Sequence, residues 1–151
     1  ISGPEPQRTI FQDIIEKKLE RLQGAFVVIA GKTESDSITK KGNDLIIYDH
    51  LGSKKLHTLI SRANIIICRS GYSSIMDLVT LKKKALLVPT PGQTEQEYLA
   101  KHCKANKLFE YMDQKFFSTS NLLEQNDLPE PTVLFEDNDL LDNAWKEVSK
   151  S

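Results

Sequence analysis

Three polar segments carry the side chains best suited to chemistry, and each directly follows residues with the pattern of a strand. They are Ser2–Gly3–Pro4, Arg69–Ser70–Gly71–Tyr72–Ser73–Ser74, and the segment Pro89–Thr90–Pro91–Gly92–Gln93–Thr94–Glu95–Gln96–Glu97. In doubly wound sheets, ligands bind outside the carboxyl ends of the strands. We therefore treat these three segments as one candidate site.

The first segment, Ser2–Gly3–Pro4, precedes a helix that Pro6 opens. A glycine lets a ligand approach the backbone, and the unpaired amides of a first helical turn attract an anion. Ser2 and Gly3 therefore suit a diphosphate. The alternative is an ordinary turn between a strand and a helix.

The second segment offers Arg69 as a fixed positive charge, Ser70 or Ser73 as a helix cap, and Gly71 as a residue that tolerates positive φ. Asp77 follows in the second turn of the same helix. A carboxylate can accept hydrogen bonds from the two vicinal hydroxyls of a ribose. The alternative is that Asp77 only faces solvent and Arg69 is a surface cation.

In the third segment, two prolines and a glycine fix the loop, and Gln93, Gln96 and Glu97 offer donors and acceptors that match sugar hydroxyls. Thr94, with Glu97 three residues later, has the capping-box pattern of a helix start. The alternative is a well-capped surface helix whose acidic residues favour its dipole.

Helical and strand periods alternate along the chain. The apolar spacing predicts helices over about 6–22, 55–63, 72–81, 94–106, 118–125 and at the C-terminus, and strands over 25–30, 45–48, 65–68, 85–88 and 132–135, with 31–43 a loop. Lys40–Lys41 and Lys82–Lys83–Lys84 are interpreted as surface turns. This order is typical of an α/β, Rossmann-like three-layer sandwich with a mainly parallel sheet, here one domain over residues 1–151.

Several functional classes are disfavoured. The net charge of -1 gives no general attraction to nucleic acid. A GxGxxG motif, a GxxxxGK[ST] phosphate loop and a GxSxG elbow are all missing from the sequence, and His50, His57 and His102 do not have the spacing of a zinc pair. We therefore expect neither a cofactor nor a metal ion.

Together, the three segments resemble the C-terminal domain of glycosyltransferase family 28, a family with the two-domain GT-B fold. The most specific part is ANIIICRSGYSSIMDL followed by KKALLVPTPGQTEQEY. In the family, a strand that ends in Cys-Arg is followed by a small residue and glycine, and an acidic residue stands eight positions after the arginine. Here those positions are Arg69 and Asp77. The family usually has Glu at the position of Asp77, and Gln at that of Glu97.

The resemblance implies a nucleotide-sugar donor that is UDP-linked, with the ribose on Asp77. The diphosphate would lie at Ser2–Gly3 and at the segment from Arg69 to Ser73, and the donor sugar at Gln96 and Glu97. It further implies an inverting, metal-independent transfer of a hexose or N-acetylhexosamine to an acceptor hydroxyl. The general base would belong to an N-terminal acceptor domain or partner subunit, so this chain alone is expected to be inactive. The expected location is the cytoplasm, at the inner face of the membrane for the full-length protein.

Two other interpretations remain open at this point. A sugar-nucleotide epimerase of the GT-B fold would contain a similar nucleotide-binding half. A non-catalytic α/β module that binds a partner protein would have the same pattern of elements and would bind no nucleotide.

Overall fold

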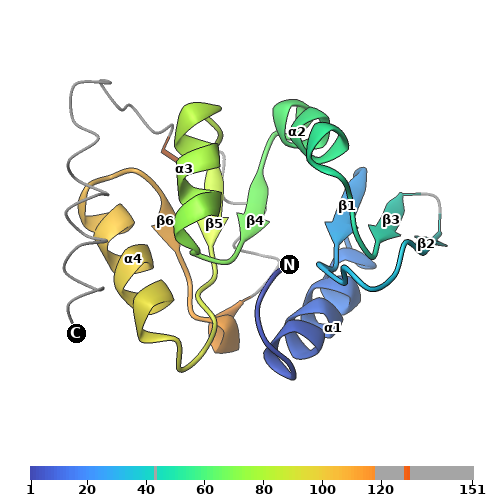
Figure 1. Cartoon of the computed structure of the whole chain (residues 1–151), viewed down its shortest axis with the longest axis horizontal. Coiled ribbons are helices and arrows are strands. Elements are labelled where there is room, and N and C mark those ends of the chain that lie inside the picture. The colour runs from blue at the N-terminus through green and yellow to red at the C-terminus, as the bar shows by residue number, and fades with distance from the viewer. Residues whose placement is uncertain (43, 118–127, 130–151) are drawn as a thin grey trace. The chain divides into compact units, whose positions relative to one another are not determined.

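A computed structural model describes residues 1–42, 44–117 and 128–129 of the chain (Figure 1). The described part of the chain divides into two compact units, Ile1–Arg62 and Ala63–Phe117, and residues 128–129 belong to the second. The helix predicted over 118–125, the strand over 132–135 and the C-terminal helix lie outside the described residues. Among the described helices, none is long and apolar enough to cross a membrane.

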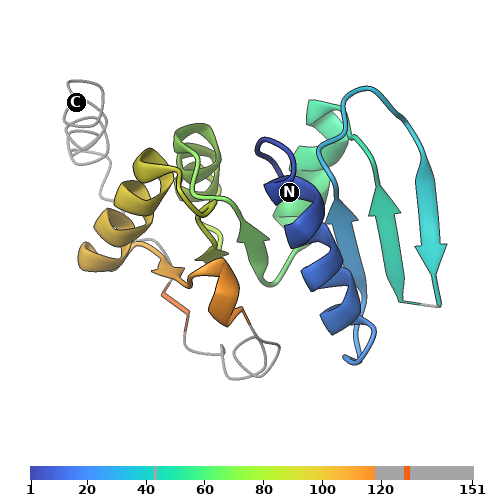
Figure 2. The same cartoon turned by 90° about the horizontal axis from the view of Figure 1, so that it is seen from below.

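The first unit contains α1 (Gln7–Leu19), β1 (Phe26–Ile29), β2 (Ile38–Lys41), β3 (Leu45–Tyr48) and α2 (Ser53–Arg62). Its sheet has the order β1-β3-β2, with β1 and β3 parallel and β2 antiparallel to β3 (Figure 2). The helix α1 forms because Phe11, Ile15 and Leu19 recur every fourth residue and are all buried.

The strand β2 corrects the sequence analysis, which predicted a loop over 31–43 and a surface turn at Lys40–Lys41. All four residues of β2 are exposed, so the strand shows no alternation of apolar and polar side chains. Main-chain pairing with β3 and an ion pair hold it instead. Lys41 Nζ lies 2.6 Å from Glu16 Oε2 on α1, and Gln12 of the same helix donates to Glu16 Oε1 over 2.6 Å.

The second unit contains β4 (Ile66–Cys68), α3 (Tyr72–Thr80), β5 (Ala85–Leu87), α4 (Thr94–Ala105), β6 (Glu110–Tyr111) and the short 3-10 helix η1 (Gln114–Phe116). Its strands are all parallel, in the order β4-β5-β6. Figure 1 shows α4 beside β6, in gold and orange. Strands and helices alternate along this unit and the strands form a parallel sheet, as predicted. The fold class is α/β and Rossmann-like.

The core of the second unit is the apolar side of α3 and α4 packed on β5. Its buried members are Ile75, Leu78, Val79, Ala85, Leu87, Leu99, Ala100, Cys103, Leu108 and Phe109. Cys68 and Cys103 are both free thiols, and burial raises the pKa of each to about 12. Both thiols therefore stay protonated near neutral pH and belong to the core.

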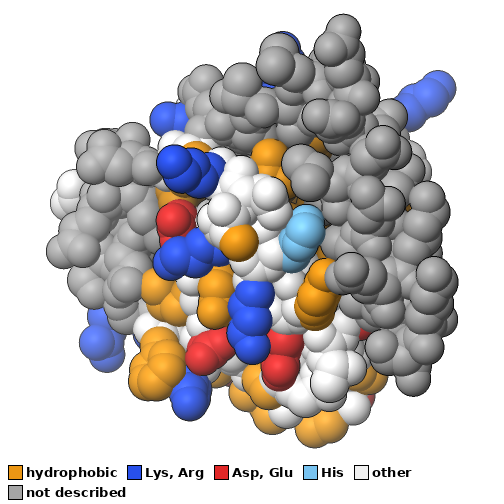
Figure 3. All heavy atoms as spheres, turned by 90° about the vertical axis from the view of Figure 1, so that its left-hand side faces the viewer, with side chains coloured by type: hydrophobic (Ala, Val, Ile, Leu, Met, Phe, Trp, Pro, Cys, Tyr) orange, Lys and Arg blue, Asp and Glu red, His pale blue; other side chains and the backbone are white. Residues whose placement is uncertain are grey.

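The face of the molecule on the α4 side is drawn in Figure 3. Over its described residues, Lys and Arg side chains lie beside acidic and apolar ones. The pattern agrees with the nearly neutral net charge of the chain.

The N-terminal segment reaches the end of β1 through a glycine. The backbone nitrogen of Ile1 donates to Ile29 O, and a Cβ on Gly31 would lie 2.2 Å from Ile1 O. Gly31 also has φ of +72°, a conformation that side chains with a Cβ rarely adopt. Glycine at position 31 therefore lets Ile1 and Ser2 lie directly against the carboxyl end of β1.

We expect Gly31→Ala to destabilise the protein by at least about 3 kcal/mol, because backbone strain and overlap with Ile1 add together. Gly42→Ala is the matched control: Gly42 has φ of +62°, but a Cβ there would meet nothing within 4 Å. The control should lose only about 1–2 kcal/mol, the cost of the left-handed conformation. Denaturant unfolding followed by circular dichroism measures both. Equal losses would contradict the close approach of Ile1 to Gly31.

Candidate functional site

The second unit brings two helix starts to the carboxyl edge of its sheet. β4 ends at Cys68 and leads through Arg69–Ser70–Gly71 into α3, and β5 ends at Leu87 and leads through residues 88–93 into α4. All the sequence-predicted residues from Arg69 to Glu97 therefore belong to two neighbouring loops and the helices that follow them. Parallel pairing of β4 with β5 is what places the two loops side by side.

The start of α3 is open. Its N-cap residue is Gly71, which has no side chain with which to cap the helix. A Cβ built on Gly71 would meet nothing within 4 Å. The first backbone bond of the helix runs from Ile75 N to Gly71 O, over 3.0 Å. Gly71 has φ of -75°, so the positive φ considered from the sequence is not used. The glycine at position 71 leaves space in front of the first-turn amides of α3, where an anion could bind.

Asp77 lies one turn after Ser73 on the exposed side of α3. Both residues are exposed, while Ile75, Leu78 and Val79 of the same helix are buried. Residues four apart lie on the same face of a helix, so Ser73 and Asp77 are neighbours there. Neither side chain bonds to any other residue that the structure describes. The carboxylate of Asp77 is therefore accessible and has no structural role in the described part of the chain.

The start of α4 is held by its own side chains. Gln96 Oε1 accepts the Thr90 N–H over 2.9 Å, and Gln96 Nε2 donates to Gln93 Oε1 over 2.5 Å. Glu97 Oε1 accepts the Gly92 N–H over 3.1 Å. Gln93, not Thr94, is the N-cap residue, and the Glu97 carboxylate reaches the loop at Gly92 instead of forming a capping box with Thr94. The loop is thus fixed by the same three residues that were predicted to meet the sugar.

Ser70 joins the two loops. It is fully buried, and its hydroxyl donates to Gln96 O over 2.7 Å. The predicted role of Ser70 as a helix cap does not hold, since Gly71 is the N-cap of α3 and has no side-chain capping bond. Ser70 instead fixes the distance between the β4–α3 loop and the first turn of α4.

Arg69 is buried as well, with 1% of its surface exposed, and is therefore not a surface cation. Its Nη1 donates to Val88 O over 3.1 Å and to Pro89 O over 3.2 Å. Its Nη2 donates to Gln114 Oε1 over 2.8 Å. Burial lowers the pKa of the guanidinium to about 10, so it remains charged at neutral pH. The structure gives Arg69 partners inside the second unit, in the loop that follows β5 and in η1.

The start of α1 differs from that of α3. Arg8 N donates to Pro4 O over 3.1 Å, and Thr9 N donates to Glu5 Oε2 over 3.2 Å. Glu5 also pairs with Arg8, whose Nε and Nη2 both lie 2.8 Å from Glu5 Oε1, and this pairing lowers the pKa of Glu5. At this helix start the Thr9 amide thus already has a carboxylate partner from the chain itself, and the Arg8 amide has a carbonyl partner.

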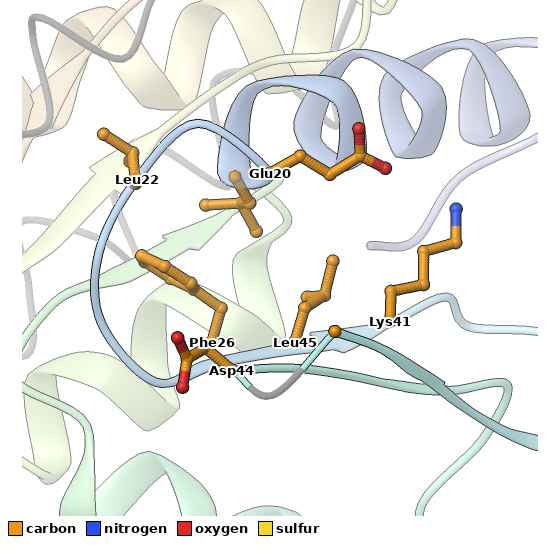
Figure 4. Close-up of a pocket in the computed structure, with 8 residues that line it drawn as sticks. Glu20, Leu22, Phe26, Lys41, Asp44 and Leu45 are labelled. Carbon is orange, nitrogen blue, oxygen red and sulfur yellow. The ribbon is translucent and has the colours of Figure 1, made fainter.

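A hollow of about 290 Å³ lies elsewhere in the first unit, and Figure 4 shows its lining. Phe26 and Leu45, the first residues of β1 and β3, form part of it, together with Glu20, Leu22 and Lys41. The hollow is therefore at the amino ends of the parallel strands, opposite to the edge where such sheets bind ligands. It contains none of the predicted site residues.

Sequence reasoning missed two residues of these networks. Gln114 lies in a stretch with no clear period, and only its buried contact with Arg69 reveals it. Glu5 stands four residues before Thr9 at a helix start. This placement could have indicated that its carboxylate accepts a first-turn N–H of the helix. No group of three or more possible metal ligands occurs in the ranges that the structure describes.

Comparison with known proteins gives two results. Residues 7–138 match the family described as "Glycosyltransferase family 28 C-terminal domain". The chain is also 26% identical, over 120 residues, to the UDP-N-acetylglucosamine--N-acetylmuramyl-(pentapeptide) pyrophosphoryl-undecaprenol N-acetylglucosamine transferase of Sulfurihydrogenibium sp. (strain YO3AOP1). That similarity covers 78% of this chain but 33% of the relative, so the chain spans about a third of the relative's length. Because the family match covers most of the chain, the protein belongs to glycosyltransferase family 28 through its C-terminal domain.

Proposed function

We propose that this chain is the donor-binding domain of an inverting glycosyltransferase and that it holds a uridine diphosphate sugar along α3. The observation that carries the proposal is the open start of α3 at Gly71, with the exposed carboxylate of Asp77, which has no partner among the described residues, on the same helix. Ser73 and Asp77 are separated by about 6 Å along the helix axis. A nucleoside diphosphate could therefore place its phosphate at the first turn and its ribose diol at Asp77.

The diphosphate is assigned to the first turn of α3 for an electrostatic reason. The first turn of a helix stabilises negative charge, and Gly71 leaves the space that a phosphate oxygen needs. The start of α1 is less suitable, because the Glu5 carboxylate already bonds to its Thr9 amide. The role of Ser2 and Gly3 at the diphosphate stays a prediction from the sequence.

The donor sugar is assigned to Gln93, Gln96 and Glu97. Their side chains already bond to the loop, but each retains capacity for more hydrogen bonds. Gln96 still has a second N–H, and Glu97 still has its other carboxylate oxygen, Oε2. Because the loop fixes these groups before any sugar arrives, they would bind its hydroxyls at little cost in conformational entropy.

The reaction we infer is displacement at the anomeric carbon by an acceptor hydroxyl, with the nucleoside diphosphate as leaving group. The contribution of this chain would be to orient the donor and to stabilise the charge that develops on the departing diphosphate. The base and the acceptor site would come from an N-terminal domain or partner subunit, so this chain alone would transfer no sugar. Action without a metal ion, and at the inner face of the membrane, belong to the same proposal. The named transferase relative favours this proposal over an epimerase or a non-catalytic module.

Asp77 provides the first test. Asp77→Asn should lower the affinity for uridine diphosphate about tenfold, because a charge-assisted pair of bonds to the ribose diol is weakened. Stability should not change, since the side chain is exposed. Isothermal titration calorimetry with uridine diphosphate and its 2′,3′-dideoxy analogue measures the effect.

Asp113→Asn is the control, because Asp113 is an exposed carboxylate of the same unit and its replacement changes the net charge equally. The dideoxy analogue should bind the wild type and Asp77→Asn with equal affinity. If Asp77→Asn binds uridine diphosphate as tightly as the wild type, Asp77 is not the ribose ligand.

Gly71 provides the second test. Gly71→Ala is compatible with φ of -75° and with the open space, so its stability should change by no more than about 1 kcal/mol. The new methyl group would occupy the space assigned to a phosphate oxygen. Affinity for uridine diphosphate should fall about tenfold, a loss of about 1.4 kcal/mol, while affinity for uridine stays the same.

Gly52→Ala controls for the loss of a glycine at a helix start. Gly52 O accepts the Leu56 N–H of α2, and a Cβ at Gly52 would also meet nothing within 4 Å. A loss of uridine diphosphate affinity in both alanine variants, or in neither, would contradict a phosphate position at Gly71.

A further inference from the structure

The loop between β5 and α4 has an unusual need for hydrogen-bond donors. The backbone ladder between β4 and β5 continues for one residue past the strands, through Val88 N to Cys68 O over 2.8 Å, and then the two chains diverge. The next carbonyls, those of Val88 and Pro89, are buried, and Pro89 and Pro91 have no N–H with which to extend the pairing. Buried carbonyls without donors would destabilise this loop.

Arg69 supplies the donors at this point. It is the first residue after β4, and its single Nη1 bonds to both Val88 O and Pro89 O. Its Nη2 is held by Gln114 of η1, which has 8% of its surface exposed. The planar guanidinium therefore connects three segments, the end of β4, the beginning of the β5–α4 loop, and η1, in one fixed geometry.

The far end of the same loop is fixed by α4. Thr90 N bonds to Gln96 and Gly92 N bonds to Glu97, while Ser70, the residue after Arg69, bonds to Gln96 O. Consecutive residues of the β4–α3 loop thus hold the two ends of the β5–α4 loop. A displacement at Val88 and Pro89 would be transmitted along four residues to the side chains of Gln93, Gln96 and Glu97.

We propose that Arg69 is a positioning residue for donor-sugar binding, which acts through Val88, Pro89 and Gln114 and does not touch the diphosphate. The proposal rests on the assignment of the sugar to the start of α4, made above. It differs from a direct role for the Arg69 charge at the phosphates, because the two roles affect different parts of the ligand.

The two roles can be separated with two ligands, uridine diphosphate and UDP-N-acetylglucosamine, and with variants at both ends of the network. Arg69→Met and Gln114→Leu should each lower the affinity for UDP-N-acetylglucosamine about tenfold and leave that for uridine diphosphate nearly unchanged. Gln114→Glu keeps an acceptor for Arg69 and should bind like the wild type. Lys115→Leu, a change at an exposed neighbour in η1, is the matched control.

Amide hydrogen exchange adds a structural readout. Thr90 and Gly92 N–H groups should exchange faster in Arg69→Met and Gln114→Leu, because the loop that presents them loses its anchor. Val79→Ala, a core change away from the loop, controls for lost stability: it should unfold more easily, yet bind both ligands as the wild type does. Gln114→Leu leaves the guanidinium in place and keeps the test decisive if Arg69→Met does not fold.

Three results would overturn the proposal. Equal losses of both ligands in Arg69→Met, with none in Gln114→Leu, would assign Arg69 to the phosphates. Unchanged affinities in Arg69→Met and Gln114→Leu would limit Arg69 to stability, and the proposed function would stand. If the wild type binds neither ligand, the proposed function itself is wrong, and the role of Arg69 in sugar binding is wrong with it.

Discussion

The end of the β4–β5 ladder is the constraint on which the second unit depends. Parallel strands that separate to open a site leave buried carbonyls behind them, and those carbonyls need donors. Here the donor is a guanidinium at the first position after β4, with 1% of its surface exposed. A lysine could not provide the same planar set of donors to two carbonyls and an amide oxygen. The arrangement explains why an arginine occupies a position where the sequence alone indicated a ligand-binding cation.

Two helix starts in this chain illustrate opposite uses of the same geometry. At α1, Glu5 bonds to a first-turn amide and pairs with Arg8, so the chain supplies its own anion. At α3, Gly71 leaves the first turn without a side-chain cap and with open space before it. Both starts follow a loop with glycine, and both attract negative charge. Of these two starts, that of α3 leaves the attraction available to a bound molecule.

Much of the fold could be predicted from the sequence, because buried strands such as ALL of β5 are short apolar runs, and the helices have apolar residues every third or fourth position. β2 was missed because its four residues are all exposed and depend on pairing with β3. At the site, the sequence located the loops but not the bonds within them. The pairing of β4 with β5 decides whether Arg69, Ser70 and Gln96 face solvent or the interior of the protein. A local sequence pattern does not predict that pairing.

The most direct test of the account is to follow the backbone amides by NMR while uridine diphosphate is added. We expect the largest shifts at residues 71–74 and 77, with Arg8 and Thr9 of α1 nearly unaffected because their amides already bond to Pro4 and Glu5. Shifts confined to the hollow around Phe26 and Leu45, or to the start of α1, would contradict it, as would the absence of saturable shifts at millimolar ligand.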